Sequence, residues 1–550
     1  MNLIRDYIVD IRREFTGYNG VTFKKDLLAG LTTGAVALPL ALAFGASSGA
    51  DAASGMIAAI TAAFVIGALS GASFQISGPT GAIAAILAPL ASRYGLEVVF
   101  ASGLLAGVLL ILIGLSKAGK MFNIMPTAVI TGFTSGLALL IALGQVGNLL
   151  GVHTKGESIL QMLIFLFHNL PAVNYYALTL GVAVVAFIFL WPQKWNSVVP
   201  GSLLAIVIVT TIQALFALPV EVVGLIPQTL LHETRLDIAF FFKPGTWDVI
   251  MLPGLSIAVL CLIESLLCGV VGGRMKGEIL NTDRELVAQG IGNLILPFLG
   301  GVPASAAIAR TSVAIKTGCQ TRLTGIIHGV FLLASMFFLS PLMSKIPLSA
   351  LAGVLIVTSW RMNDWENIRY LFGKRFGGSI AKFLVTLIAT VVFDLTIAIA
   401  AGFIIAIVLF VVEMCSLDVV VSEFDQSRME ENLDLPLKTE VVYVTGSLFF
   451  GSIRTFEEKI KKANANLVIL SMRGVPSMDV SATLTLLKFC ETRKKAGLQV
   501  AFSCLAPDVR QMLDRGGVTE LVGESVYFPT AKDALIKYSR MYSSMLSRSE

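Results

Sequence analysis

Gly78-Pro79-Thr80-Gly81-Ala82 begins a short apolar segment in the first half of this sequence, and Gly300-Gly301-Val302-Pro303-Ala304-Ser305 begins a second one in the other half. The apolar stretches that contain or follow these motifs, 79–92 and 304–317, are shorter than the roughly 20 residues of a membrane-spanning helix. Paired short segments interrupted by Gly and Pro are typical of membrane proteins built from inverted repeats. The two motifs therefore predict the architecture of the whole membrane part.

The sequence around these motifs consists of long apolar runs from about Leu27 to Val412. Of the 550 residues, 55% are hydrophobic and only 14% are charged, whereas soluble proteins are about 25% charged. Lipid is therefore the expected solvent for most of the chain. Fourteen segments are read as membrane-spanning: 27–46, 53–71, 79–92, 98–115, 126–150, 176–191, 199–218, 252–273, 285–299, 304–317, 324–343, 348–358, 380–396 and 397–413.

The two interrupted segments are the third and the tenth of the fourteen, so they hold matching positions in two halves of seven. An odd number of spans in each half inserts the second half upside down, and the two short helices then face each other near the midplane. Their N-terminal ends present unpaired N–H groups and positive dipole ends, which favour an anion. The alternative is that both segments are ordinary interfacial or re-entrant pieces.

The distribution of Lys and Arg predicts that both termini are cytoplasmic. If the N-terminus is inside, the expected inner loops hold most of the cations, among them Arg274, Arg322 and Lys374, and the outer loops hold few. The first 26 residues are polar and lack the pattern of a signal peptide. We expect an integral protein of the plasma membrane, which is the inner membrane in bacteria.

From about Ser416 onward the charge density is normal for a soluble protein, which predicts a separate C-terminal domain. Strand-like and helix-like stretches alternate there, as in α/β domains with a parallel or mixed sheet. The expected strands are 441–444, 467–472 and 498–502, and the expected helices are 454–463, 481–496 and 508–515. The predicted boundaries are 1–26 for a cytoplasmic N-terminal segment, 27–413 for the transmembrane domain, 414–437 for a linker, 438–540 for the α/β domain and 541–550 for a C-terminal tail.

Several motifs together carry a family resemblance: Leu38–Phe44, Ser77-Gly78-Pro79-Thr80, Gly300-Gly301-Val302-Pro303, Ile308-Ala309-Arg310-Thr311 and Thr321–Gly325. With them the sequence resembles the SulP sulfate permeases, relatives of the animal anion exchangers, over nearly its whole length. The C-terminal domain resembles a STAS domain, named for sulfate transporters and anti-sigma-factor antagonists. The resemblance implies a core domain and a gate domain, elevator-like movement and usually a homodimer.

The resemblance places the anion between the N-termini of the third and tenth helices, against the first helix. Carried over to this sequence, the substrate-binding residues are Phe44, Ser77, Gly78, Thr80, Ala307, Ile308, Ala309 and Arg310. Arg310 adds a permanent charge in apolar surroundings, which is costly unless the charge is paired or faces a cavity. Its side chain is expected to serve either the anion or a structural ion pair with Glu264, and the two roles could alternate.

Glu264 lies in the middle of the eighth apolar segment, where an ionised carboxylate is costly. This makes it a candidate proton carrier. In the sodium-coupled bicarbonate relatives, an acidic residue at this position helps to bind Na⁺. Two hydroxyl side chains of that sodium site correspond here to Cys268 and Ile308. Because hard cations prefer oxygen ligands, we expect proton coupling rather than sodium coupling.

The sequence thus predicts a secondary active transporter of small anions, with proton–sulfate symport as the first hypothesis. Sodium-coupled bicarbonate transport or C4-dicarboxylate transport is the alternative within this class. A membrane sensor that acts through the STAS domain is the alternative outside it. No catalytic motif, metal-ligand spacing or cluster of basic and aromatic residues occurs, so we expect no enzyme activity, cofactor, metal or nucleic acid.

The predicted STAS domain offers two regulatory candidates at the turn between a strand and a helix. Asp479 is expected to cap the helix, and Ser481 is a candidate phosphorylation site, because a Ser at this turn can be phosphorylated in anti-sigma-factor antagonists. The resemblance also makes a cytoplasmic protein a candidate partner of this domain.

Overall fold

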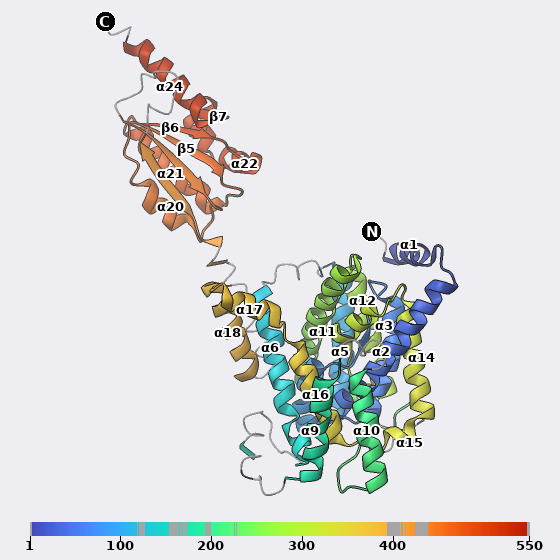
Figure 1. Ribbon diagram of the computed structural model, residues 1–550. Helices are drawn as coiled ribbons and strands as arrows, with labels where there is room; N and C mark the ends of the chain where they lie inside the picture. Colours follow the sequence, from blue (N-terminus) through green and yellow to red (C-terminus); the bar gives the residue numbers. More distant parts are fainter. Residues whose placement is uncertain are drawn as a thin grey trace. The chain divides into compact units, whose positions relative to one another are not determined.

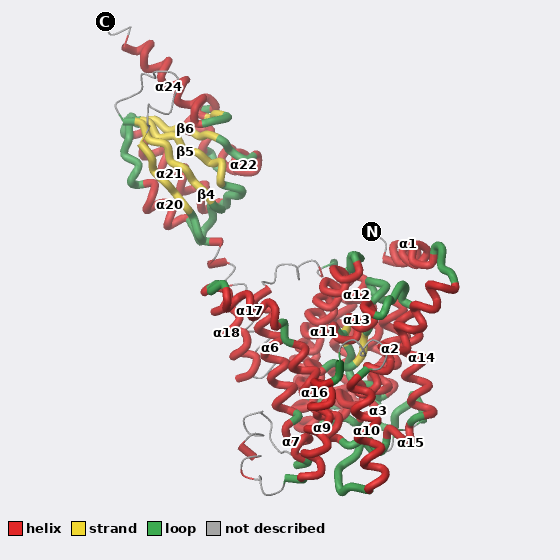
Figure 2. The backbone as a smooth tube through the Cα atoms, viewed as in Figure 1, coloured by secondary structure: helices red, strands yellow, loops and turns green. Residues whose placement is uncertain are grey.

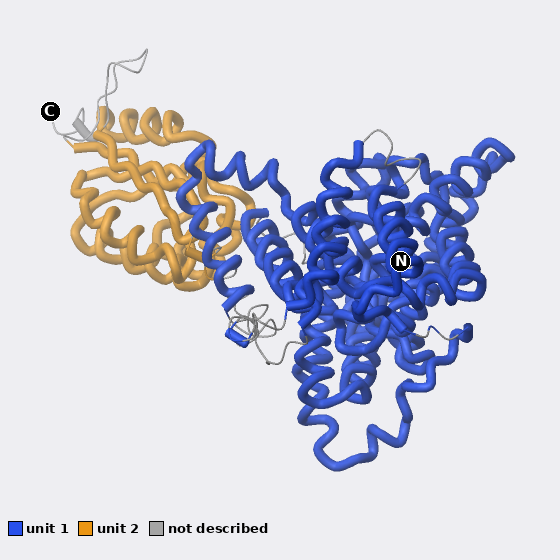
Figure 3. Tube along the Cα trace, turned by 60° about the horizontal axis from the view of Figure 1, so that its bottom comes forward, with its two compact units in different colours: residues 1–403 blue, residues 404–550 orange. Residues whose placement is uncertain are grey.

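The computed structural model of the protein describes residues 3–117, 119, 127–152, 164–165, 168, 173–192, 200–224, 226, 228–392, 408, 411–412, 414–423 and 438–546. The chain divides into two compact units, Met1–Phe403 and Ile404–Glu550, which Figure 3 shows in two colours. Unit 1 contains the apolar segments, and unit 2 contains the α/β part.

Unit 1 is built almost entirely from helices, most of which lie alongside one another (Figures 1 and 2). Its described helices are α1 (Leu3–Phe15), α2 (Gly20–Ser47), α3 (Ala52–Leu69), α4 (Gly81–Tyr94), α5 (Leu96–Leu115), α6 (Thr127–Gly144), α7 (Val146–Leu150), α9 (Tyr175–Leu190), α10 (Gly201–Phe216), η3 (Ile238–Phe242), α11 (Thr246–Lys276), α12 (Thr282–Leu299), α13 (Ile308–Lys316), α14 (Leu323–Phe338), α15 (Ser340–Met343), α16 (Leu348–Met362), α17 (Trp365–Gly373) and α18 (Gly377–Val392).

Each of the first thirteen expected membrane segments contains a described helix, from α2 in 27–46 to α18 in 380–396. The expected segment 126–150 is divided, because α6 and α7 are separate helices on either side of Gln145. The fourteenth segment, 397–413, lies largely outside the described residues. Among the helices that the structure describes, five are long and apolar enough to cross a membrane, and six more are apolar but shorter.

Glycines allow two helices of unit 1 to pack in direct backbone contact. A Cβ atom added at Gly290 of α12 would lie 2.7 Å from the carbonyl oxygen of Gly107 in α5, and one added at Gly107 would lie 2.8 Å from the carbonyl oxygen of Gly290. Close packing of this kind drives association of helices in lipid, where no hydrophobic force acts between them. The same face of α5 continues at Gly103, where an added Cβ would lie 2.6 Å from Pro303. The α5–α12 pair therefore supports the second interrupted segment.

The two interrupted segments each begin with an extended stretch and continue as a short helix. Strand β1 (Ser77–Gly78) precedes α4, and strand β2 (Ser305–Ala306) precedes α13. The strands pair antiparallel, with Ser77 opposite Ala306 and Gly78 opposite Ser305, and Figure 2 shows this short pair among the helices. Because no water is available at membrane depth, backbone groups outside a helix must find partners within the protein. Here each half of the chain supplies those partners to the other.

Unit 2 contains a five-stranded sheet in the order β3-β4-β5-β6-β7. Strand β3 is antiparallel to β4, and the other neighbours are parallel. Buried apolar side chains of the strands and helices form its core. Its described elements are β3 (Asp418–Glu423), β4 (Thr439–Thr445), α20 (Ile453–Ile460), β5 (Leu467–Gly474), α21 (Val480–Lys495), β6 (Gln499–Ser503), α22 (Pro507–Arg515), α23 (Val518–Val522), η5 (Glu524–Val526), β7 (Tyr527–Phe528) and α24 (Ala531–Leu546).

The six strands and helices expected for the C-terminal domain are all present, as β4, α20, β5, α21, β6 and α22. Strand β3 was not expected and falls inside the predicted linker 414–437. It contains the short β-branched run Val419–Val421, which favours a strand, but only Val419 is fully buried, because β3 lies at the edge of the sheet. Helix α24 extends into the predicted tail 541–550, and residues 424–437 lie outside the described part.

Candidate functional site

The two short helices of unit 1 start on either side of the two-residue β ladder. Because β1 pairs with β2, the starts of α4 and α13 are held close together although they belong to different halves of the chain. Phe44 joins them from α2, since a Cβ atom added at Gly81 would lie 2.9 Å from the Phe44 ring. All eight predicted substrate-binding residues therefore lie at this place: Phe44, Ser77, Gly78, Thr80, Ala307, Ile308, Ala309 and Arg310.

The N-termini of the two short helices differ in how they are capped. Thr80 is the N-cap of α4, and its hydroxyl accepts a hydrogen bond from the Ile83 N–H at 3.4 Å. Ala307 is the N-cap of α13, and its methyl group cannot accept one. The first N–H groups of any helix have no partner within the helix. Since Ala309 in the first turn of α13 is exposed, this end offers backbone donors and a positive dipole end to an anion.

Arg310 points its guanidinium group across the ladder toward the start of α4. Its Nη2 donates to the Pro79 carbonyl oxygen at 2.5 Å, and a Cβ atom added at Gly78 would collide with Nη1. The side chain is 1% exposed, yet Nη1 has no hydrogen-bond partner among the described residues. The structural ion pair with Glu264 that was one of the two expected roles is not formed by direct contact among the described residues, although the two opposite charges interact electrostatically. The guanidinium group is therefore held in place with one donor unused.

Glu264 of α11 connects the two interrupted segments. Its Oε2 atom accepts a hydrogen bond from the Thr80 hydroxyl at 2.8 Å and another from the Ser305 hydroxyl. The two hydroxyl oxygens are 3.5 Å apart, so one carboxylate oxygen joins the start of α4 to β2. Glu264 as a whole residue is half-buried. Ser305 had no predicted role, although it ends the second Gly/Pro motif.

A sodium site was not expected, because Cys268 and Ile308 stand at the two positions where the sodium-coupled relatives are expected to have hydroxyl side chains. The structure shows that the Cys268 thiol donates to Thr311 at 3.2 Å. It also shows that Thr80 and Ser305 place two other hydroxyl oxygens at Glu264. More oxygen ligands therefore lie near Glu264 than the residue types at positions 268 and 308 indicated.

Polar side chains of α12 form hydrogen bonds with β1 and with the residue that precedes β2. The Gln289 side chain donates to the Ser77 hydroxyl at 2.8 Å. The Asn293 side chain both donates to the Ala304 carbonyl oxygen at 2.8 Å and accepts from the Ala304 N–H at 2.9 Å. Neither residue had a predicted role. Their signal was present, however, because two amides four residues apart on one face of an apolar segment are expected to be paired inside the protein.

A second set of contacts anchors the other side of the ladder. The Thr311 hydroxyl accepts from the Ile76 N–H at 3.0 Å, and the Ile76 carbonyl oxygen accepts from the Ala307 N–H at 3.0 Å. The Ser265 hydroxyl, one residue after Glu264, accepts from the Ala306 N–H at 3.3 Å. The extended stretches are thus fixed by side chains on several elements, which gives the two helix starts a defined position.

In unit 2, Asp479 caps α21 as predicted. Its carboxylate accepts from the Ala482 N–H at 2.9 Å and from the Phe450 N–H at 2.9 Å, so it also fixes the preceding loop. Ser481 follows in the first turn and is half-buried. A phosphorylation role for Ser481 stays a prediction.

Both units match the models of known protein families. The model of the family described as "Sulfate permease family" matches residues 23–381, and the one described as "STAS domain" matches residues 432–534. The putative sulfate transporter YvdB of Bacillus subtilis is 34% identical to this chain over 528 residues, which cover 94% of this chain and 97% of the relative. The bicarbonate transporter BicA of Picosynechococcus is 28% identical over 517 residues, which cover 89% of this chain and 90% of the relative.

Two solved structures share the fold. SLC26A9 superimposes with a TM-score of 0.84 at 16% identity, over 97% of this chain and 93% of that chain. The transmembrane domain of a cyanobacterial BicA superimposes with a TM-score of 0.64 at 29% identity, over 70% of this chain and 98% of that chain. The first likeness extends over both units, and the second is a likeness to a membrane domain alone.

Proposed function

Because the chain belongs to the sulfate permease family and carries a STAS domain, we propose that it is a secondary active transporter of small anions, with sulfate as the first candidate substrate. The names of the relatives support two substrates, since YvdB is named a putative sulfate transporter and BicA a bicarbonate transporter. Sulfate is placed first because YvdB is the more similar of the two and covers nearly the whole chain.

The observation that carries the proposal is a buried cation with an unused donor beside an uncapped helix start. Arg310 Nη1 has no partner among the described residues, and Ala307 provides no cap to α13. An anion between them would receive a charge-assisted hydrogen bond from the guanidinium group and further bonds from backbone N–H groups. Such an anion would supply the acceptors that this part of the protein lacks.

We propose that Glu264 couples transport to protons. The Thr80 hydroxyl donates to the Glu264 carboxylate and accepts from the Ile83 N–H at the start of α4. The charge of Glu264 therefore lies next to the proposed anion site. Protonation would remove a negative charge that repels an arriving anion, and it would reduce the cost of that carboxyl group at membrane depth. Both effects favour binding of the anion together with a proton.

Sodium-coupled bicarbonate transport is the second candidate, and a specific observation favours it. The Glu264 carboxylate and the hydroxyls of Thr80 and Ser305 gather at one point, and hard cations take oxygen ligands of these kinds. The likeness to BicA over 89% of this chain supports the same substrate.

Transport by the purified full-length protein in proteoliposomes distinguishes these candidates. We would measure uptake of labelled sulfate under an inward proton gradient and under an inward sodium gradient, with bicarbonate and fumarate as competitors. Uptake that follows the proton gradient without sodium supports the proposal. Uptake that requires sodium and is inhibited most by bicarbonate supports the second candidate. If the folded protein takes up no labelled sulfate, uptake of labelled bicarbonate and of labelled fumarate is measured under the same gradients, and failure with all three anions contradicts both candidates and favours a sensor role.

A further inference from the structure

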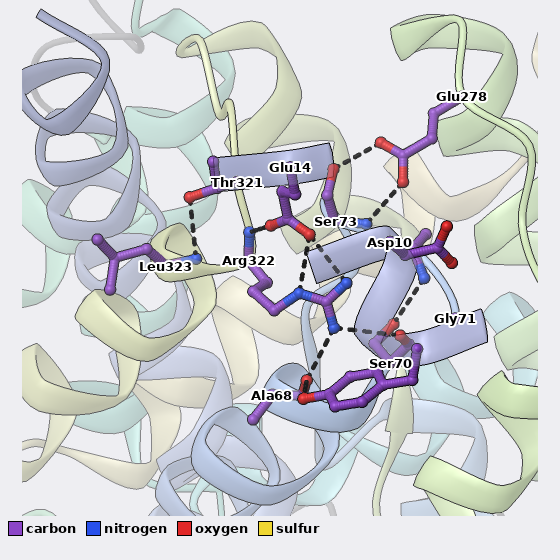
Figure 4. Close-up of polar contacts among 12 residues, drawn as sticks. Asp10, Glu14, Ala68, Ser70, Gly71, Ser73, Glu278, Thr321, Arg322 and Leu323 are labelled. Atoms are coloured by element: carbon purple, nitrogen blue, oxygen red, sulfur yellow. Dashed lines mark hydrogen bonds and ion pairs between the residues drawn. The ribbon is translucent and has the colours of Figure 1, made fainter. Parts of the chain in front are cut away.

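Two buried arginines hold helix α1 against the rest of unit 1. Glu14 forms an ion pair with Arg322 at 2.9 Å, and Asp10 forms one with Arg284 at 2.5 Å. Both arginines also donate to backbone carbonyl oxygens at the C-terminal end of α3: Arg322 to Ala68 in its last turn at 2.8 Å, and Arg284 to residues 70 and 71 just after it at 3.1 and 3.0 Å. Figure 4 shows Glu14 and Arg322 within this cluster. The acidic side of α1 is therefore occupied by contacts within the protein.

The opposite side of α1 combines apolar and basic side chains. Arg5, Ile8, Val9 and Arg12 are spaced i, i+3, i+4 and i+7, which places them on one face of a helix, and all four are exposed. Val9 is 55% exposed. Across residues 3–25, every Lys and Arg is exposed, whereas the acids Asp6, Asp10 and Glu14 are half-buried. The outward face of α1 thus carries positive charge together with apolar surface.

The same pattern continues at the start of α2. Val21, Lys24, Lys25 and Leu28 have the same spacing, and all of them are exposed. Val21 is 68% exposed. Farther along this face, α2 is apolar enough to cross a membrane, so Leu28 belongs to a surface that meets lipid. Residues 16–19 alone separate the exposed face of α1 from the start of α2, and Lys24 and Lys25 lie where the apolar span begins.

We propose that α1 and the first turns of α2 form a surface that binds the anionic headgroups of the adjoining membrane leaflet. The apolar side chains Ile8, Val9 and Val21 would enter the boundary between headgroups and acyl chains, while the long basic side chains reach the phosphates. Positive charge near an anionic bilayer is attracted to it, and this attraction falls off with salt. The surface is separate from the anion site, so it does not depend on the substrate that the protein carries.

The depth of a nitroxide label in the full-length protein tests this proposal. Val9→Cys would be labelled in a Cys415→Ser, Cys504→Ser background, because the other four cysteines are buried. The labelled protein would be reconstituted in phosphatidylcholine vesicles, with or without phosphatidylglycerol. Collisions with lipid-soluble oxygen and with a water-soluble nickel chelate would then be compared. Lys488→Cys on the exposed surface of α21 is the reference position for a label in water.

We expect oxygen to dominate at position 9, and its excess over the nickel chelate to increase when phosphatidylglycerol is added. Arg5→Gln with Arg12→Gln should remove that increase. Lys461→Gln with Lys462→Gln, which removes the same charge from exposed sites of unit 2, should preserve it. Dominance of the nickel chelate in both lipid mixtures would overturn the proposal, because the face would then lie in water. Protection from both reagents would also overturn it, because protein, such as unit 2 or a second copy of the chain, would then cover the face.

Discussion

Arg310 carries a buried charge, and its surroundings narrow the roles that this charge can have. A guanidinium group at membrane depth is costly unless it is paired or faces a cavity, and its one described hydrogen bond is to a neutral carbonyl oxygen, that of Pro79. Among the described residues, Glu264 is close enough to interact electrostatically with Arg310, but it forms no direct ion pair with the guanidinium group. An anionic substrate would neutralise it, which couples occupancy of the site to the stability of its surroundings.

Replacing Arg310 by Ala should weaken anion binding strongly. A hydrogen bond to a charged group contributes about 1.5–3 kcal/mol, which corresponds to roughly ten- to a hundredfold in affinity. Lys should restore only part of it, because an ammonium group lacks the planar fork of Arg. Calorimetric titration of sulfate into the purified protein measures the change. Arg274→Ala, at an exposed site on α11, is the matched control and should bind normally, and an unchanged affinity in the Arg310→Ala protein would exclude the assigned role.

Replacing Glu264 by Gln imitates the protonated acid and should separate binding from coupling. The amide oxygen can still accept from Thr80 and Ser305, which are the two donors that the carboxylate has now. We therefore expect sulfate to bind but no longer to accumulate in response to a pH gradient. Uptake under a proton gradient, compared with equilibrium exchange of labelled sulfate, measures the two properties. Accumulation equal to that of the natural protein would show that the proton is carried elsewhere.

At the scale of single elements, one substitution at the uncapped start of α13 should keep or raise the stability of the protein and at the same time lower its affinity for the anion. Ala307 has the extended backbone typical of an N-cap, with φ −112° and ψ 117°. Ala307→Asn should add the missing cap and stabilise the helix by about 1 kcal/mol, but its side chain would take N–H groups from the anion. The melting temperature should therefore stay the same or rise while sulfate affinity falls. Ala307→Val, which adds volume without an acceptor, distinguishes capping from simple obstruction.

The contact between α5 and α12 gives a second element-scale prediction. Gly290→Ala would place a methyl group against the Gly107 carbonyl oxygen, and overpacking of this kind costs roughly 1–3 kcal/mol. We expect a lower melting temperature in detergent. Gly144→Ala at the end of α6 is the control, because an added Cβ there meets no atom within 4 Å. Equal melting temperatures for the two variants would show that α5 and α12 can move apart without cost.

The elements that sequence analysis predicted are those with a local pattern. Apolar length identified the membrane helices, and Gly and Pro identified both interrupted segments. The pairing of β1 with β2 and the bond from Ser305 to Glu264 could not be predicted, because they join residues far apart along the chain and leave no periodic signal. The docking of α1 was missed for the same reason, since its acids look like an ordinary solvated helix face until Arg284 and Arg322 are placed beside them.

At the scale of the whole molecule, two separate cores predict separable units. Truncation after about Ser416 removes all strands of the unit 2 sheet and leaves the described helices of unit 1 intact. The truncated protein should still insert into membranes and bind sulfate, while transport falls. Sulfate titration and proteoliposome uptake measure the two effects. Loss of sulfate binding in a monodisperse truncated protein would contradict the modular interpretation.

The ladder between β1 and β2 also has a consequence for how the protein is made. Ser77 and Gly78 leave the ribosome long before their partners Ala306 and Ser305 exist. At about 5–20 residues per second, the translation of residues 79–304 takes on the order of ten to fifty seconds. During that time the first extended stretch has no permanent partner for its backbone groups, and lipid cannot supply one. The nascent first half must therefore wait in the translocon, under an insertase or at the wet membrane surface, and a message that ends before β2 should yield a chain that membrane proteases degrade.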